Sequence, residues 1–439
     1  MVREGRETSG FFPESLPHTL KLSTLKYFGS EISHIQRVRK DKSMRIVIIG
    51  GAGTQGNVIA RDISENPDVK EILIADWNEA KAKETAASLN DPRVKSSFVD
   101  AYDIDATANL IKGYDAVINS GQYDINVSVM KACLKAKVRH YTDVGGAFHW
   151  TRQQLELMDD VKKGGLTAVI GAGLSPGITD VMARYAYDRL DEVEAVHVEG
   201  AVADLTDTKG ISVWRPTSLR TELRATLRQT IEYRNGEHRT LPPLAGERMI
   251  TFPEPIGQLP CHYVVHPELA TIPIAFKDKG IKDVTLSLNM GVENEVINRC
   301  LAMVGMASDK PLMVRGVEVI PLEVVAAAAG RETRERLEGV ELELNKVNCF
   351  RSRVIGKKDG KKLEYSLSTF TKPHSRWKVD HVTGVPLAIT AQMQLNGMIS
   401  EPGIWSPEQV IDPEYFFQEL AKREIYITAE IKERLAGID

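Results

Sequence analysis

Short apolar runs alternate along the first part of the chain with segments in which apolar residues recur at helical spacing. After Met44 the apolar runs are RIVIIG, EILIAD, VKSSFVD, DAVINS, RHYTDVGG and LTAVIGAG, which we predict to be strands. Between them lie GTQGNVIARDISEN, NEAKAKETAASLN, IDATANLIKG, NVSVMKACLKAK and TRQQLELMDDVKKGG, which we predict to be helices. This alternation predicts an α/β fold with a Rossmann-type, doubly wound parallel sheet.

The pattern changes near Leu190, where longer strands with alternating apolar and polar residues begin. EAVHVEGAVAD, DVTLSLNMGV, VELELNKVNCFRSRVIG and KLEYSLSTFT have this pattern, and the turn KKDGKK joins the last two. We also expect helices over residues 217–232 and 321–329. These elements predict an inserted, mixed α+β domain, after which VPLAITAQMQLNGMI returns to a helical pattern.

The domain boundaries follow from these changes of pattern. We assign residues 44–190 to a dinucleotide-binding domain, 191–383 to a substrate domain and 384–439 to a C-terminal helical segment that returns to the first domain. Residues 1–43 mix charges, proline and glycine, and they lack the continuous apolar core of a signal peptide. We therefore expect a poorly ordered extension that the folded protein does not need, with Met44 as a candidate native start.

Composition narrows the classes of function. The 439 residues are 42% apolar and 26% charged, which is typical of a globular protein of more than one domain. The net charge of −4, without a basic block, argues against nucleic acid or a membrane surface as partner, and no apolar run reaches the about 18 residues of a membrane helix. The cysteines, which are Cys133, Cys261, Cys300 and Cys349, have no CxxC spacing, so we expect neither disulfides nor zinc, and a reducing cytoplasm.

The segment GGAGTQG, which follows the first predicted strand and opens a helix, has the spacing G-x-G-x-x-G. In such a turn Gly51 allows the tight bend, Gly53 lets the backbone approach a pyrophosphate, and Gly56 lets helix and strand pack closely. The free N–H groups of the helix N-terminus then favour a phosphate. Asp76 ends the second strand, where a carboxylate accepts the ribose hydroxyls of NAD. The alternative is a glycine-rich turn in an α/β protein that binds no nucleotide.

Further polar residues end the next strands at the same edge of the sheet. We expect Asp100 near adenine and Asn119 and Ser120 near the nicotinamide ribose, although ordinary helix caps are the alternative. Because Asp76 would repel a 2′-phosphate and DWNEA offers no arginine, we predict NAD rather than NADP. The predicted cofactor-binding residues are Gly51, Gly53, Thr54, Gln55, Gly56, Asp76, Asp100, Ala101, Asn119 and Ser120.

Several motifs in order along the chain resemble those of one family. IIGGAGTQG, DVGG, GAGLSPGITD, TGVPLAITAQMQLNGMI and EQVIDPEYFFQELAKREI are similar to segments of the saccharopine dehydrogenase-like reductases, and most similar to the L-lysine 6-dehydrogenases. The resemblance is strong over the first domain and patchy in the middle of the chain. It implies a Rossmann domain, an inserted substrate domain and a C-terminal helix that packs back on the first domain.

One position bears on the reaction. Saccharopine-forming members typically carry Asp before the Pro-Gly of GLSPG, whereas this chain has Ser175, as expected of a lysine dehydrogenase with its small residue there. The resemblance thus implies NAD-dependent oxidation of L-lysine at its ε-carbon. Two alternatives stay open: a saccharopine or carboxynorspermidine reductase, which joins an aldehyde and an amine, and a regulatory protein that binds NAD without turnover.

Oxidation of an amine requires a base, because only the neutral amine yields hydride and an ε-ammonium has a pKa of about 10.4. Asp143, at the end of the fifth predicted strand, is one candidate; capping a helix near Thr151 is its alternative role. His262 is another, since a histidine can be neutral near pH 7 and the resemblance suggests a histidine near this position. The resemblance also implies that Tyr123 lies near the nicotinamide, unless it is a core residue.

The remaining candidates bind substrate. His266 and His149 could contact it, and Arg220 and Arg224, one helical turn apart, could clamp a carboxylate unless they are simply solvated. HYVVH lacks the HExxH context of a zinc site, so we expect no metal. We expect a small amino acid as substrate and a homodimer or higher homo-oligomer.

Overall fold

A computed structural model describes residues 44–214, 219–289, 291–343, 345–371 and 381–434. The extension predicted over residues 1–43 lies outside these ranges. The first sheet has the order β17-β6-β5-β4-β1-β2-β3, and all of its paired strands are parallel. Its strands are β1 (Met44–Ile49), β2 (Val69–Asp76), β3 (Val94–Phe98), β4 (Ala116–Asn119), β5 (His140–Asp143), β6 (Thr167–Val169) and β17 (Gly403–Trp405).

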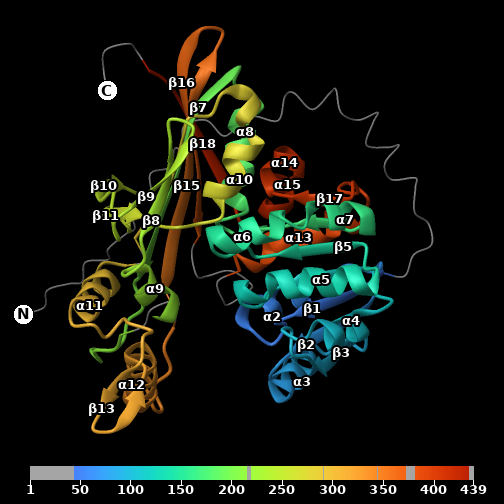
Figure 1. Ribbon diagram of the computed structural model, residues 1–439, viewed down its shortest axis with the longest axis vertical. Coiled ribbons are helices and arrows are strands. Elements are labelled where there is room, and N and C mark those ends of the chain that lie inside the picture. Colours follow the sequence, from blue (N-terminus) through green and yellow to red (C-terminus); the bar gives the residue numbers. More distant parts are fainter. Residues whose placement is uncertain (1–43, 215–218, 290, 344, 372–380, 435–439) are drawn as a thin grey trace, which may run out of the picture. The chain divides into compact units, whose positions relative to one another are not determined.

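Helices cover both faces of this sheet because successive side chains of a strand point to opposite faces. Val47 and Ile49 of β1 pack in one apolar cluster with α4 (Ile104–Ile111), α5 (Asn126–Ala136) and α7 (Met158–Gly164), as Figure 1 allows the reader to follow. Ile46 and Ile48 pack in another cluster with α2 (Thr54–Ser64) and α13 (Gly384–Leu395). The remaining helices of this part are α3 (Glu79–Ser88), the 3₁₀ turn η1 (Tyr123–Ile125) and α6 (Phe148–Leu155). The predicted doubly wound α/β fold is confirmed.

The register of the parallel strands brings their carboxyl ends together. Ile49 of β1 pairs with Asn119 of β4, which pairs in turn with Asp143 of β5. The loops that follow these strands therefore leave the sheet at one edge, beside the glycine turn after β1. In open α/β sheets this edge is where ligands bind.

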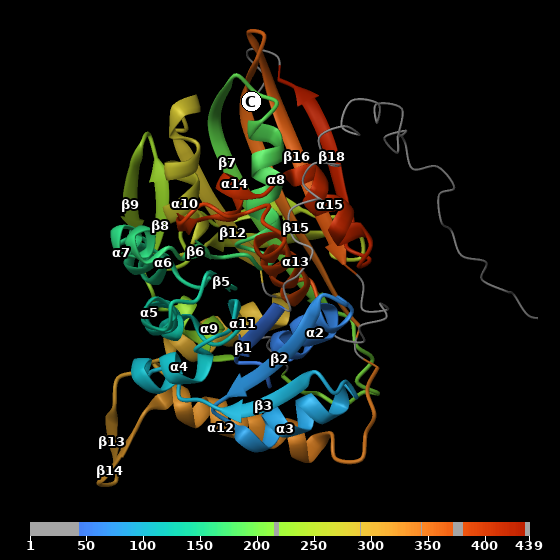
Figure 2. The same cartoon turned by 90° about the vertical axis from the view of Figure 1, so that its right-hand side faces the viewer.

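The second sheet is mixed and has nine strands, with the main order β10-β11-β12-β7-β15-β16-β18 and with β8 pairing β12 and β9 (Figure 2). A turn with Asp359 at φ +50° and Gly360 at φ +77° joins β15 to β16, as KKDGKK predicts. The strands are β7 (Glu192–Asp204), β8 (Thr230–Arg234), β9 (Glu237–Leu241), β10 (Arg248–Thr251), β11 (Gln258–Tyr263), β12 (Asp283–Asn289), β15 (Lys346–Lys358), β16 (Lys361–Thr371) and β18 (Ile427–Glu433).

The remaining elements of the described residues are a small sheet and several helices. A separate two-stranded sheet consists of β13 (Leu312–Val314) and β14 (Val317–Val319). The helices are α8 (Ile178–Tyr187), α9 (Leu219–Ala225), α10 (Glu268–Ala275), the 3₁₀ turn η2 (Lys277–Lys279), α11 (Val292–Met303), α12 (Pro321–Arg336), α14 (Pro407–Val410) and α15 (Pro413–Ala421).

Several predicted helices were wrong in extent. The segment 151–165 belongs to two helices, α6 and α7, rather than to one. The helix expected over 217–232 is only α9 within the described residues, and β8 and β9 follow it as a hairpin. Asn235 at φ +53° and Gly236 at φ +83° form its turn, and Asn-Gly is a strong hairpin signal that outweighs the helical spacing before it.

The C-terminal segment was predicted to be helical, and this is only partly correct. α13 does pack against α2 and β5. However, β17 adds to the edge of the first sheet beside β6, and β18 pairs with β16 in the second sheet. A strand of three residues, such as β17, is too short to show periodicity.

Candidate active site

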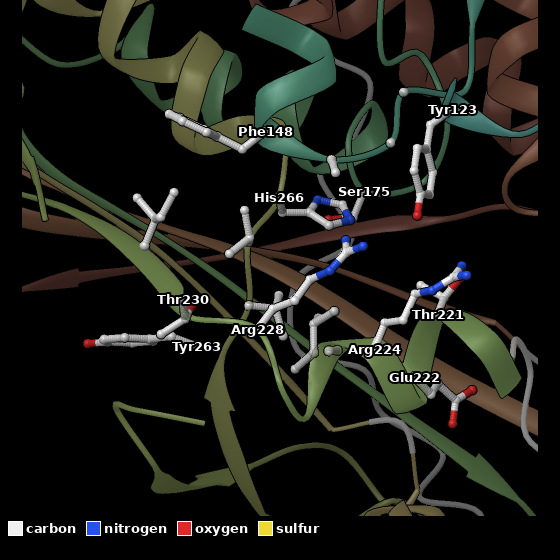
Figure 3. A pocket seen from close by; sticks show the side chains of 18 of the residues that line it. Tyr123, Phe148, Ser175, Thr221, Glu222, Arg224, Arg228, Thr230, Tyr263 and His266 are labelled. Carbon is white, nitrogen blue, oxygen red and sulfur yellow. The ribbon is translucent and has the colours of Figure 1, made fainter. Parts of the chain in front are cut away.

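A cavity of about 890 Å³ lies at the carboxyl edge of the first sheet. On one side it is lined by the loops after β4 and β5 and by the Ser175–Pro176 turn. On the other side it is lined by α9, β8, β11 and α11 of the second part of the fold (Figure 3). Its apolar wall includes Phe148, Val264 and Leu288, which limits the water around the polar groups described below.

The glycine turn after β1 fits a dinucleotide pyrophosphate. A Cβ atom on Gly56 would lie 2.5 Å from both Gly50 O and Gly51 Cα, so only glycine allows α2 to start this close to the strand. A Cβ on Gly53 would meet only Gly50 O, at 3.2 Å, within 4 Å. Gly53 is the N-cap of α2 and makes no side-chain cap bond, so the helix N-terminus is available to a phosphate. Thr54 and Gln55 are the first residues of this helix.

Asp76 stabilises this turn through hydrogen bonds. Its Oδ2 accepts a hydrogen bond from Ala52 N at 3.1 Å, and its Oδ1 accepts one from Asn78 N at 2.9 Å. A carboxylate can accept about four hydrogen bonds, so these leave lone pairs for ribose hydroxyls. Ser120 also approaches the turn, because its Oγ donates to Ile49 O at 2.9 Å.

The other predicted cofactor-binding residues differ in their solvent exposure. Asp100 is exposed and accepts a hydrogen bond from Tyr102 N at 3.0 Å, while Ala101 beside it is buried. Asn119 is fully buried, and its amide donates to Asn126 Oδ1 at 2.8 Å. Its Oδ1 accepts from Gly121 N at 3.1 Å, so the Asn119 side chain orders the loop after β4 and does not face the ligand edge.

Asp143 does not line the cavity. It is fully buried, and its carboxylate accepts hydrogen bonds from Tyr141 Oη at 2.8 Å, Gln154 Nε2 at 2.6 Å, and Gly145 N and Gly171 N at 2.8 and 2.9 Å. Burial raises the pKa of Asp143 although these hydrogen bonds oppose the shift. The expected cap is also absent, since α6 begins at Phe148 with Ala147 as its N-cap. The geometry therefore gives Asp143 a structural role, in which it fixes two glycine turns beside the cavity.

Tyr123 points into the cavity from the start of η1 (Figure 3). Gly146 is needed beside it, because a Cβ at this position would lie 2.0 Å from Tyr123 Cβ. The loops after β4 and β5 thus pack directly together and hold the tyrosine in place.

His266 lines the cavity and forms a carboxylate–imidazole pair with Glu268. Its Nδ1 lies 2.5 Å from Glu268 Oε2. Glu268 is fully buried, and its other oxygen accepts from Ser175 Oγ at 2.5 Å and from Thr179 Oγ1 at 3.2 Å. Burial alone would raise the pKa of Glu268, but His266 and the hydrogen bonds outweigh it and the pKa is lowered. With Nδ1 engaged, Nε2 of His266 is left for a group in the cavity.

Two further carboxyl groups, Asp180 and Glu408, are fully buried near this pair. Burial raises the pKa of Asp180 well above its ordinary value, and the charges of Glu408 and Glu268 add to the shift. Burial likewise raises the pKa of Glu408 to about 7, with Glu268 adding repulsion. Deprotonation of Glu408 above neutral pH therefore costs folded-state stability.

Glu408→Gln should stabilise the protein at alkaline pH. Because the folded pKa lies above the ordinary value of 4.5, the free energy of unfolding should fall as pH rises between those values. The substitution removes this cost, so at pH 8 it should add about 1–3 kcal/mol, and at pH 5 it should change little. Urea unfolding at both pH values measures this, and an equal loss of stability at both would contradict the assignment.

The arginines of the cavity differ from those expected. Arg224 lines it, as predicted, together with Arg228 from the turn before β8, and Figure 3 shows both side chains pointing toward the same part of the cavity as His266. Arg220 does not line it. Its guanidinium instead binds Glu323 of α12, with Nη2 2.7 Å from Oε2, so the predicted clamp of Arg220 with Arg224 is wrong.

His149 and His262 both line the cavity. His149 on α6 is exposed for much of its surface, and the partial burial of its ring, followed by the charge of Arg228, lowers its pKa. His262 lies on β11, where it is only 5% exposed. Burial lowers its pKa to about 4, so its imidazole is neutral at physiological pH. The nearest carboxylate, Glu295 Oε2, lies 3.7 Å from His262 Nδ1.

Among the described residues, no group of His, Cys, Asp and Glu could hold a metal ion. No helix in the same ranges is long and apolar enough to cross a membrane.

The fold and the cavity together define the class of the protein. A dinucleotide-binding edge and a partly apolar cavity with an imidazole–carboxylate pair are the features of a nicotinamide-dependent oxidoreductase. The chain belongs to the saccharopine dehydrogenase family, since the family models for the NADP binding domain and the C-terminal domain match residues 46–169 and 173–425. It is therefore a dehydrogenase that acts on carbon–nitrogen bonds with a nicotinamide cofactor.

Three known proteins are similar to most of this chain. Carboxyaminopropylagmatine dehydrogenase of Synechocystis sp. is 25% identical over 86% of this chain and 96% of that protein. Carboxynorspermidine synthase of Vibrio cholerae is 29% identical over 84% of this chain and 92% of that protein. The fold matches saccharopine dehydrogenase (L-Glu forming) of Saccharomyces cerevisiae with a TM-score of 0.66 and 17% identity, over 89% of this chain and 100% of that one. The sequence relatives favour the aldehyde-and-amine hypothesis over the lysine dehydrogenase hypothesis.

Proposed function

We propose that this enzyme joins an amine to an aldehyde that carries a carboxylate, by reduction of the imine that they form. The observation that carries the proposal is the placement of Arg224 and Arg228 in the wall of the cavity that His266 and Tyr123 also line. Arginine is well suited to bind a carboxylate, and the neighbouring groups can exchange protons with the reacting centre. The names of the two sequence relatives likewise describe a carboxyl group attached to norspermidine and to aminopropylagmatine.

The chemistry requires proton transfers that these residues can supply. The neutral amine adds to the aldehyde carbon, and loss of water from the adduct gives a C=N bond; the departing oxygen needs a proton. A reduced nicotinamide cofactor, when bound, supplies the hydride that turns this C=N bond into the C–N bond of the product. The reverse direction would use the same groups to take the protons back.

His266 is the proposed acid and base of the reaction. Its Nδ1 is fixed by Glu268, so the ring has one defined orientation and presents Nε2 to the cavity. Tyr123 Oη is proposed to hydrogen-bond the reacting oxygen or nitrogen from the nicotinamide side. Asp143, initially a candidate base, is proposed only to hold the loops that position these groups, for its oxygens are already occupied by hydrogen bonds.

Ser175 in place of Asp weakens the sequence-based case for a substrate with an extra carboxylate, but we propose that it permits such a substrate. Ser175 Oγ donates to Glu268, so a buried carboxylate does stand at this place, contributed by α10 rather than by position 175. A small residue at 175 is therefore compatible with the aldehyde-and-amine reaction. Oxidation of L-lysine stays the second candidate, favoured only by the sequence resemblance.

The test is cofactor oxidation with aldehydes and amines, offered singly and in pairs. We expect NADH or NADPH to be consumed only when an aldehyde that bears a carboxylate and an amine are both present. Rapid reduction of NAD by L-lysine alone, without turnover of any pair, would favour the second candidate instead.

We propose NAD as the preferred cofactor, although the matching domain model is named for NADP. Asp76 ends β2 with its carboxylate at the glycine turn, where it would repel a 2′-phosphate. The kcat/KM for NADH should exceed that for NADPH by about 10-fold or more. Asp76→Ser combined with Trp77→Arg should reverse the preference. A wild-type preference for NADPH would contradict this assignment of Asp76.

A further inference from the structure

Exposed aromatic side chains gather at the ends of β2 and β3. Among the residues that the structure describes, four Phe, Tyr or Trp side chains are exposed, namely Trp77 at 77%, Phe98 at 55%, Tyr102 at 63% and Tyr426 at 59%. Three of the four belong to one place: Trp77 directly follows β2, Phe98 ends β3, and Tyr102 lies in the loop after β3. Large apolar surfaces left in water cost free energy, and clustered ones are typical of a binding site.

The pairing of the two strands brings these residues to the cofactor-binding edge of the first sheet. Asp76 of β2 pairs with Phe98 of β3, and Val99 N donates to Asp76 O at 3.0 Å. The chain therefore leaves both strands side by side, as Figures 1 and 2 both show for β2 and β3. Because the Asp76 carboxylate also binds Ala52 N of the glycine turn, Trp77 directly adjoins the place proposed for the cofactor ribose.

Tyr102 is exposed but is held in place. Its Oη donates to Asp124 Oδ2 at 2.7 Å, and chiefly this hydrogen bond raises the pKa of Tyr102 to about 12, so the phenol stays a donor. Its backbone N–H donates to Asp100 Oδ1 at 3.0 Å. Ser128 Oγ of α5 donates to Ala101 O at 2.8 Å, which ties the same loop to that helix. A ring that is both fixed and exposed is suited to stack on a ligand, because little conformational entropy is lost on binding.

The chemistry of a dinucleotide matches this place. One ribose separates the pyrophosphate from the adenine ring, so a cofactor with its pyrophosphate at the glycine turn and its ribose at Asp76 has its adenine beside the residues that follow β2 and β3. A flat aromatic base stacks well on Trp and Tyr rings. A contact with a second copy of the chain would also cover these rings, but it would not account for their position beside Asp76.

We infer that Trp77 and Tyr102 hold the adenine ring of the cofactor by stacking, with Phe98 as the apolar neighbour. The inference deepens the proposed binding of NAD and rests on it, but it does not depend on the joining reaction. A substantial part of the affinity for the cofactor then comes from these rings, in addition to the phosphate contacts at the glycine turn. The adenosine half of the cofactor is thus the part whose binding these residues determine.

The experiment measures binding of ADP-ribose, which has the adenosine and both phosphates but no nicotinamide, by titration calorimetry. Trp77→Ala should raise the Kd of ADP-ribose and of NADH alike by about 5- to 150-fold, the range expected for loss of a base–aromatic stack. Trp77→Phe keeps a ring that can stack and should stay within a few-fold of the wild type. Tyr426→Ala is the matched control, because it removes another exposed aromatic ring, and it should leave both Kd values unchanged.

Two further readouts report on the position of the base. Reduced nicotinamide mononucleotide lacks the adenosine half, so its Kd should be the same for the wild type and for Trp77→Ala. Stacking on an indole quenches its emission, so ADP-ribose should quench the tryptophan fluorescence of the wild type clearly more than that of Trp77→Phe.

The outcomes separate this inference from the proposed function. An unchanged Kd for ADP-ribose in Trp77→Ala would overturn it, whether or not an aldehyde and an amine are joined. An equal rise of the Kd for ADP-ribose and for the mononucleotide would also overturn it, since the loss would then not belong to adenine. A wild type that binds neither NADH nor NADPH would overturn the proposed cofactor and this inference with it. A variant that only lowers the molecular mass in solution, with ADP-ribose binding intact, would assign Trp77 to a contact between copies instead.

Discussion

Replacement of His266 by asparagine should lower kcat by about 10²-fold or more, the usual contribution of an acid–base group. The imidazole lines the cavity, and Glu268 fixes its Nδ1 at 2.5 Å, so Nε2 is the atom available to move a proton. Cofactor binding, measured by NADH fluorescence, should stay unchanged because the glycine turn is not touched. Steady-state kinetics over pH 6–10 measure the loss and the altered pH profile together.

Controls separate chemistry from folding. His238→Asn removes an exposed imidazole of β9 that hydrogen-bonds the Leu269 carbonyl and contacts the Phe148 and Tyr233 rings, and it should keep activity within a few-fold. Glu268→Gln keeps the shape of the pair but removes its charge, so it should change the pH profile more than the KM. Full activity of His266→Asn at saturating substrates would remove His266 from the mechanism.

Removal of both cavity arginines should lower kcat/KM by about 10²- to 10⁴-fold for an aldehyde that carries a carboxylate. Each hydrogen-bonded charge is worth about 1.5–3 kcal/mol, and each 1.4 kcal/mol is a factor of ten. Arg228 makes no ion pair with another described residue, and Arg224 only approaches Asp309, at 3.9 Å, so both guanidinium groups can bind substrate. Kinetics of Arg224→Ala/Arg228→Ala with paired aldehydes, with and without the carboxylate, give the measurement.

The matched control is Arg220→Ala. Arg220 lies on the same helix but binds Glu323, so its loss should leave kcat/KM within a few-fold. The double variant should also leave an aldehyde without a carboxylate unaffected. Equal losses with both aldehydes would show that the arginines support the fold of α9 rather than the substrate.

The cofactor-binding edge of the first sheet could be predicted because the sequence signals that define it are local. A strand, a glycine turn and a helix follow one another within RIVIIGGAGTQGNVIA, and Asp76 ends the next strand. Each of these signals needs only neighbouring residues, so the pattern identifies the parallel sheet and its ligand edge. The side chain of Asn119, which ends β4, is buried and hydrogen-bonded to Asn126, and the sequence does not tell which way a side chain at a strand end turns.

The wall of the cavity that belongs to the second part of the fold could not be predicted in the same way. Its walls come from α9, β11 and α11, which are far apart in the sequence and meet only through the second sheet. Glu295 has no motif around it, so its position 3.7 Å from His262 Nδ1 depends on tertiary packing alone. Glu268 was missed for the same reason, since its contact with Ser175 joins residues in different elements.

Arg228 is a different case. Arg220, Arg224 and Arg228 are spaced at four-residue intervals, which suggests one helical stripe. The helix ends at Ala225, so Arg228 reaches the cavity from a turn, while Arg220 is drawn away by Glu323. The spacing indicated the arginine-rich segment, but the end of the helix decided which side chains reach the cavity.

The central claim is that the enzyme makes a carbon–nitrogen bond between two molecules. A direct test is the mass of the product formed from NADH deuterated at the transferred position, a carboxylate-bearing aldehyde and an amine. We expect one product whose mass equals the sum of aldehyde and amine, less water, plus one deuterium and one hydrogen. Recovery of the amine unchanged, with deuterium only in an alcohol derived from the aldehyde or in no product at all, would contradict it.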